Sequence, residues 1–265
     1  GPGMPSMYLA HRFQHGLEKQ FVVVHWDQRG SGKSFRAELD PATISTRQLL
    51  DDLYGVTNHL QAELGVDQIY LLGHSHGSYL GMLAVYERPE LFEAYIGVGQ
   101  VANPAKAFSL QKTELEKRRS ELSIDADVAI DRQNLEQLLF EAGGQLYCCQ
   151  SFAPLLLTGL LAPEYSLMDA YNVKRGSDFS SRHMQYNVIS KPLEEAVTEV
   201  DVPTFFISGK YDLTTPSALS QAYLDDLSAP MTGYYEIDEA AHFPFFERPA
   251  EFTLALADIV QKTGN

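Results

Sequence analysis

Residues 68–87 read QIYLLGHSHGSYLGMLAVYE, and the interpretation of the whole chain starts from this stretch. Its first part, QIYLL at residues 68–72, predicts a buried strand, and residues 77–87 predict a helix. Between them, residues 73–77 (GHSHG) match G-x-S-x-G, a sharp strand-to-helix turn that exposes the hydroxyl of its serine. We expect glycines on both sides because side chains there would clash in the strained turn. We therefore predict that Ser75 is a nucleophile, against the alternative of a glycine-rich turn with an incidental serine.

A serine hydroxyl is a weak nucleophile alone and needs a base and an orienting acid. In the fold that uses this turn, the acid and then a histidine follow the serine, each just past a strand. Asp212 follows the apolar run at residues 204–207, and His242 follows the run at 234–237. We therefore predict a Ser75-His242-Asp212 triad, with a turn aspartate and a loop histidine as the alternatives.

Short apolar runs recur along the chain, with helical patterns between them, and predict an α/β fold. Near-continuous apolar runs suit a mainly parallel sheet covered on both faces by helices. Five strands are expected, at residues 21–26, 68–72, 94–98, 204–207 and 234–237. One of the intervening helices is expected to begin after Ser45, which forms a possible capping box with Gln48, and to end at Gly65. Its apolar stripe runs from Leu49 to Leu64.

Residues 104–200 interrupt this alternation because they contain no clear strand. We interpret them as a mostly helical cap inserted between two parts of the core, residues 1–103 and 201–265.

Composition excludes several classes of function. The 265 residues carry 20 Lys plus Arg against 35 Asp plus Glu, a net charge of −15. We therefore expect no nucleic-acid partner, because such binding needs clustered cations. The longest nearly apolar run, residues 152–161, is too short to cross a membrane. The adjacent Cys148 and Cys149 are expected to be free thiols in a cytoplasmic protein. No residue set has metal-ligand spacing, so no metal or cofactor is expected.

Two further motifs carry a family resemblance. Residues 27–34 read DQRGSGKS, and residues 1–3 read GPG. Together with the predicted triad they resemble the proline iminopeptidase-like branch of the α/β-hydrolase superfamily. That branch has an HGGPG motif, whose last three positions residues 1–3 match, and a DQRGxGxS motif, which residues 27–34 match throughout. The resemblance implies an α/β-hydrolase fold with a cap, and a serine hydrolase that releases an N-terminal residue from short peptides or amides.

The expected mechanism passes through an acyl-enzyme. His242 would take the Ser75 proton during attack on a carbonyl, and Asp212 would orient His242. Backbone N–H groups would hold the oxyanion, one from His76 and a second from Gly1 or Gly3, because Pro2 has no N–H.

This chain departs from the branch in two ways that keep other functions open. The branch usually has Trp where His76 stands, and its cap supplies acidic residues that hold the substrate amine. Nothing in the sequence selects among the cap carboxylates, including Glu114, Glu141, Glu164, Asp169 and Glu194. The alternatives are an esterase, amidase or lactonase acting on small acyl substrates, or a non-catalytic ligand-binding member of the fold. The expected partner is a small-molecule or short-peptide substrate, and no feature indicates an oligomeric state.

The first residues raise a separate expectation. In this fold the first three strands precede the Gly-Pro-Gly loop, so we expect N-terminal strands to be absent from this sequence. About 25–40 upstream residues would hold them, from usual strand and connection lengths. The alternative is that residues 1–3 are a cloning scar.

Overall fold

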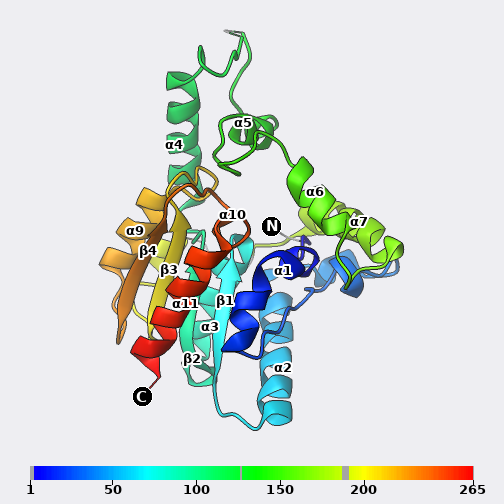
Figure 1. Cartoon of the computed structure of the whole chain (residues 1–265), viewed down its shortest axis with the longest axis vertical. Helices are drawn as coiled ribbons and strands as arrows, with labels where there is room; N and C mark the ends of the chain where they lie inside the picture. Colours follow the sequence, from blue (N-terminus) through cyan, green and yellow to red (C-terminus); the bar gives the residue numbers. More distant parts are fainter. Residues whose placement is uncertain (1–2, 126, 187–190, 265) are drawn as a thin grey trace.

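The computed structural model describes residues 3–125, 127–186 and 191–264 (Figure 1). Strands and helices alternate on both sides of a helical middle part. The strands are β1 (Ile69–His74), β2 (Phe92–Val98), β3 (Thr204–Gly209) and β4 (Thr232–Ile237). The helices are α1 (Met7–Phe13), α2 (Thr46–Leu64), α3 (His76–Glu87), α4 (Pro104–Lys117), α5 (Leu135–Glu141), α6 (Ala153–Leu160), α7 (Leu167–His183), α8 (Leu193–Ala196), α9 (Ser217–Asp226), α10 (Pro244–Glu247) and α11 (Pro249–Thr263).

The four strands form one parallel sheet in the order β1-β2-β3-β4. Its register pairs Leu72 with Ile96, Ile96 with Phe205 and Phe205 with Gly233. Because all four strands run the same way, their carboxyl ends lie together at one end of the sheet. The loops that carry Ser75, Asp212 and His242 all leave from this carboxyl-terminal end.

Helices cover both faces of the sheet, which explains the near-continuous apolar runs of the central strands. One face packs Phe205 and Ile207 against α1, α10 and α11, and the other packs Phe206 against α2, α3 and α9. Every residue of β3 is buried. The prediction of an α/β sheet covered by helices on both faces is confirmed.

The strand expected at residues 21–26 is absent. This segment is extended but belongs to no strand, and Val22 and Val24 are 73% and 49% exposed. Among the described strands, β1 lies at the edge of the sheet and pairs with β2, and Leu72 on it is 42% exposed. Residues 21–26 and β1 border the same cavity, and within the described chain no strand fills the space between them. The prediction was wrong because an apolar run becomes a strand only beside a neighbour that pairs with its backbone. Four strands are consistent with the expected absence of the family's N-terminal strands.

Helix α2 begins and ends where the sequence predicts. The Ser45 side chain accepts a hydrogen bond from the Gln48 backbone N–H at 3.3 Å. Gly65 ends the helix with a φ of 66°, a left-handed conformation that glycine adopts without a Cβ penalty. The capping signals therefore set both ends of this helix.

The described part of residues 104–200 contains α4 to α8 and none of the four strands. Figure 1 shows α4 projecting away from the sheet, with α6 and α7 on the opposite side beside α1. Leu115, Ile130 and Leu139 belong to a small separate hydrophobic cluster within this part. The cap therefore has apolar packing of its own.

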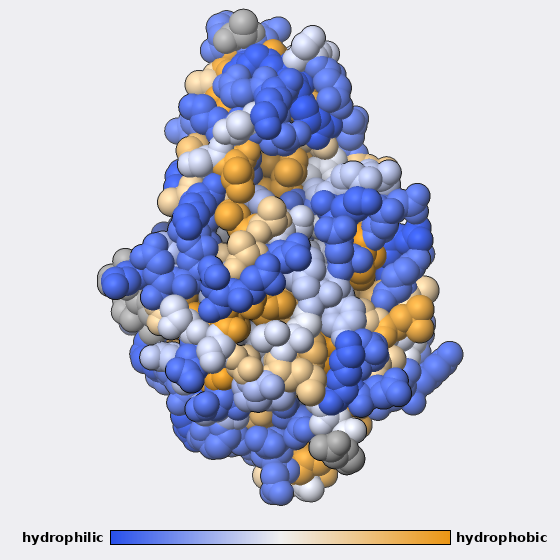
Figure 2. All heavy atoms as spheres, turned by 90° about the vertical axis from the view of Figure 1, so that its left-hand side faces the viewer, coloured by the Kyte–Doolittle hydropathy of each residue, from blue (hydrophilic) through white to orange (hydrophobic). Residues whose placement is uncertain are grey.

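Hydrophilic side chains cover most of one face of the molecule (Figure 2). Figure 2 shows a face that is mainly hydrophilic, with apolar side chains gathered below the projecting upper part. Within the described residues, no helix is both long enough and apolar enough to span a bilayer.

Two glycines of α2 test how backbone conformation contributes to stability. A Cβ at Gly55 or at Gly65 would meet no other atom within 4 Å, but only Gly65 has a positive φ. We expect Gly55→Ala to raise the free energy of unfolding by about 0.5–1 kcal/mol and Gly65→Ala to lower it by about 1 kcal/mol. Urea denaturation measures both changes, and equal effects of the two substitutions would contradict the prediction.

Candidate active site

Ser75 occupies a strained turn between β1 and α3. Its φ of 55° and ψ of −120° lie outside the regions that non-glycine residues normally adopt. A Cβ at Gly73 would collide with the Gly77 backbone carbonyl, so this position requires glycine. At Gly77 a Cβ would meet no atom within 4 Å, so the clash expected on both sides of the serine exists only at Gly73.

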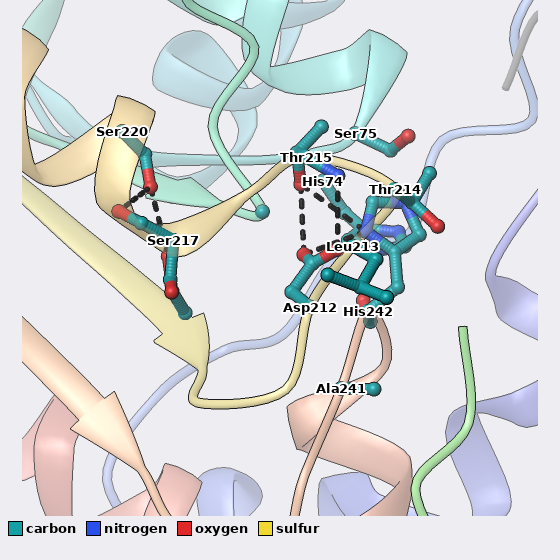
Figure 3. A network of polar contacts seen from close by, with 12 residues as sticks. His74, Ser75, Asp212, Leu213, Thr214, Thr215, Ser217, Ser220, Ala241 and His242 are labelled. Carbon is teal, nitrogen blue, oxygen red and sulfur yellow. Dashed lines mark hydrogen bonds and ion pairs between the residues drawn. The ribbon is translucent and has the colours of Figure 1, made fainter. Parts of the chain in front are cut away.

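Asp212 and His242 lie together in the interior, at the carboxyl-terminal end of the sheet (Figure 3). Nδ1 of His242 is 2.9 Å from Oδ2 of Asp212, and both side chains are almost completely buried. Thr215 donates two more hydrogen bonds to the Asp212 carboxylate, from its backbone N–H at 2.9 Å and its hydroxyl at 2.8 Å. With Nδ1–H directed at the carboxylate, Nε2 of a neutral His242 is free to accept a proton.

Ser75 and His242 line the same cavity, which has a volume of about 1660 Å³. Figure 3 shows Ser75 beside the Asp212–His242 pair. Among the described residues, no hydrogen bond joins the Ser75 hydroxyl to His242. Such catalytic hydrogen bonds often tighten only when substrate is bound. The three predicted triad residues are therefore brought to one site.

Three further residues support this pair, of which Gly99 and Thr215 were not expected from the sequence. His74 Nε2–H donates to the His242 carbonyl oxygen at 2.7 Å, which fixes the protonated nitrogen of His74. Gly99 has a φ of 54°, and a Cβ there would lie 3.0 Å from the His242 ring. Thr215 is the third supporting residue, and its place three residues after Asp212 fits an aspartate-centred turn. This spacing of three residues is the sequence feature from which the contact between Thr215 and Asp212 could have been predicted.

The structure places the predicted oxyanion donors differently relative to the cavity. His76 is the first residue of α3, so its backbone N–H has no acceptor within the helix. Gly1 lies outside the described residues. Gly3 packs against Gly176 and Ser180 of α7 and is not among the residues that line the cavity. Of the predicted donors that the structure describes, His76 lies at the cavity and Gly3 does not.

The His76 side chain is 7% exposed and also borders the cavity. Neither ring nitrogen has a hydrogen-bond partner among the described residues. Burial lowers the pKa of His76 to about 3, so the imidazole is neutral near pH 7.

Only one of the five named cap carboxylates faces the cavity. Glu141 on α5 lines it, together with Glu136. The others engage neighbours: Glu114 lies near Lys117, Glu164 near His11, Asp169 caps α7 with Ser166, and Glu194 pairs with Lys106.

The DQRG motif ties the cap to the core. Arg29 donates from Nε and Nη2 to Asp52 of α2 at 2.8 and 2.6 Å. Asp27 accepts from the Lys33 backbone N–H and from the Tyr165 hydroxyl just before α7. Burial and the Asp27 carboxylate raise the pKa of Tyr165, which therefore stays a proton donor to Asp27. Through these contacts the DQRG motif holds residues 27–33 against both α2 and the cap.

The model for the alpha/beta hydrolase fold family matches residues 1–249. The chain belongs to this family. Within the described residues, no cluster of His, Cys, Asp or Glu could hold a metal ion.

Relatives within the family include aminopeptidases. The Bacillus subtilis (strain 168) protein named probable aminopeptidase YbaC is 30% identical over 97% of this chain and 85% of its own length. The Heyndrickxia coagulans proline iminopeptidase is 23% identical over 92% of this chain and 83% of its own.

Solved structures share the fold. The proline iminopeptidase of Mycobacterium smegmatis superposes with a TM-score of 0.65 at 17% identity, over 99% of this chain and 87% of its own. A thermophilic esterase from Thermogutta terrifontis gives 0.63 at 19% identity, over 100% and 88%. The resemblance inferred from the motifs is confirmed.

Thr215 provides a test of the buried acid. Thr215→Val keeps the side-chain shape and removes the hydroxyl that donates to Asp212. Because hydrogen bonds to charged groups contribute about 1.5–3 kcal/mol, we expect kcat to fall about 10-fold or more. Steady-state kinetics with p-nitrophenyl acetate measures the change. Thr215→Ser keeps the hydroxyl and serves as the control, so equal kcat values for the two variants would contradict this role.

Proposed function

We propose that the protein is a serine hydrolase that uses Ser75, His242 and Asp212, and that it releases N-terminal residues from short peptides or amides. The observation that carries the proposal is the buried Asp212–His242 hydrogen bond beside a strained serine turn in one cavity. Relatives named aminopeptidase and proline iminopeptidase support the substrate class.

The proposed reaction begins when the Ser75 hydroxyl attacks the substrate carbonyl carbon. Nε2 of His242 takes the hydroxyl proton, and Asp212 stabilises the imidazolium that results. The His76 backbone N–H donates to the tetrahedral oxyanion. The imidazolium then protonates the leaving amine, and an acyl group remains on Ser75. Water, deprotonated by His242, attacks this ester and releases the acid.

Recognition of the substrate amine is assigned to the cap. Glu141, flanked by Glu136, supplies negative charge to the cavity that contains Ser75. Gln137 donates to Glu141 Oε1 at 2.8 Å and leaves Oε2 available for an ammonium group. A carboxylate in this place distinguishes an aminoacyl substrate from a plain ester.

Labelling with a fluorophosphonate tests the hydrolase itself. The folded protein should form an adduct on Ser75, and Ser75→Ala should not react. Mass spectrometry locates the adduct. An unlabelled, folded protein would instead support a non-catalytic ligand-binding role.

Glu141→Gln tests the amine site. Loss of a charge-assisted contact of about 1.5–3 kcal/mol should raise KM for prolyl- or alanyl-β-naphthylamide about 10-fold or more. KM for p-nitrophenyl acetate, which has no amine, should not change. Glu114→Gln is the matched control because Glu114 is a cap carboxylate away from the cavity. Equal effects on amide and ester would remove Glu141 from amine recognition.

An esterase or lactonase is the second candidate. His76, in place of the usual Trp, favours acyl substrates of another shape. Hydrolysis of simple esters without any hydrolysis of aminoacyl-naphthylamides would select this candidate.

A further inference from the structure

The cap stretch Gly144–Cys148 runs between the two loops that carry Asp212 and His242. The backbone N–H of Leu213, the residue after Asp212, donates to the Gly144 carbonyl at 3.0 Å. The backbone N–H of His242 donates to the Gln145 carbonyl, also at 3.0 Å. Two successive cap residues therefore bond to the acid loop and to the histidine itself.

Glu247 of α10 closes this arrangement from the other side. Its Oε1 accepts from the backbone N–H groups of Tyr147 at 2.6 Å and Cys148 at 3.1 Å. Its Oε2 accepts from the backbone N–H of Ala241 at 2.8 Å. Ala241 directly precedes His242, so one carboxylate joins the cap stretch to the histidine loop.

We propose that Glu247 is a positioning residue, whose carboxylate holds Tyr147, Cys148 and Ala241 together and thereby keeps His242 aligned with Asp212. This inference rests on the proposed function, because it assigns a role relative to the proposed triad. It also means that the placement of the cap and the alignment of the histidine depend on the same contacts.

The chemistry of the three contacts requires a carboxylate. The three backbone groups that bond to Glu247 are all N–H donors, and a carboxylate offers acceptors on both oxygens. Among the described residues, Glu247 has no ion-pair partner, so these donors balance its charge. Burial raises the pKa of Glu247, while the N–H groups act in the opposite direction. Protonation would replace an acceptor by a donor and weaken the contact.

Glu247→Gln tests the role directly. The glutamine amide must direct an NH₂ group at one of the N–H donors, so one side of the bridge is lost. We expect kcat for p-nitrophenyl acetate to fall about 10-fold or more, with KM within about 2-fold, because the substrate cavity keeps its lining. Glu251→Gln is the matched control: Glu251 pairs with Arg248 and contacts neither catalytic loop. Glu247→Asp keeps the charge and should recover part of the activity.

The pH profile separates positioning from a purely structural effect. Since Gln resembles the protonated acid, the ratio of wild-type to Glu247→Gln activity should be largest above the Glu247 pKa. It should fall toward one as the pH is lowered through that pKa. The titratable group that faces the carboxylate is the Cys148 thiol, whose pKa burial raises to about 12, so it stays neutral throughout. Asp212 and His242 are the same residues in both proteins, so the ratio compares proteins that differ only at position 247.

Gly144→Ala tests the same bridge at a second point. A Cβ at Gly144 would lie 2.6 Å from the Leu213 Cβ, so the stretch must move away from the acid loop. We expect this variant also to lose kcat about 10-fold for the ester. Gly55→Ala, in open space on α2, is the control for the same chemical change.

The outcomes distinguish this inference from the proposed function. If the wild-type protein is not labelled by a fluorophosphonate, the triad itself fails. If the wild type is labelled, but Glu247→Gln keeps the wild-type labelling rate and kcat, only the positioning role is overturned. An activity ratio that does not change with pH also overturns it. Thermal melting of each variant identifies any loss that is due to unfolding, and Glu247→Asp and Gly144→Ala then decide the role.

Discussion

The buried carboxylate of Asp212 is the constraint around which the site is organised. A charged group without water must be fully hydrogen-bonded, and Thr215 and His242 supply these bonds. The remaining strands serve the same arrangement. The end of β1 brings His74 against the His242 carbonyl, and Gly99 after β2 leaves room for the imidazole. Each of the four strands therefore contributes at its carboxyl end, and the site depends on the strands staying in parallel register.

Sequence reasoning succeeded where the signal is local and failed where it depends on a distant neighbour. The G-x-S-x-G turn and the capping of α2 are both properties of short segments. Residues 21–26 have an equally strong strand pattern, but pairing requires a second strand beside them. In the same way, the carboxylate at Glu141 cannot be told from the one at Glu164 until folding shows which one faces the cavity.

Two of the places where the described cap meets the core differ in their chemistry. On one side Asp27 accepts from Tyr165, and the neighbouring Arg29 binds Asp52, so the DQRG turn links the cap to α2. On the other side backbone groups near Gly144 and the Glu247 carboxylate link the cap to the catalytic loops. The first junction is made by side chains that the family motif specifies. The second is made largely by backbone groups, which carry no pattern in the sequence.

Among the described strands, β1 pairs on one side only, and apolar side chains lie beside its other side. Backbone groups on an edge strand can pair with a strand of another molecule, and exposed Val22, Val24 and Leu72 add apolar surface beside it. The net charge of −15 opposes the approach of two copies. Dissolved salt weakens this repulsion, over a screening distance of about 8 Å at physiological ionic strength, without weakening apolar contact in the same way. Charge repulsion between copies of the described chain therefore weakens as salt is added, whereas contact between apolar surfaces does not.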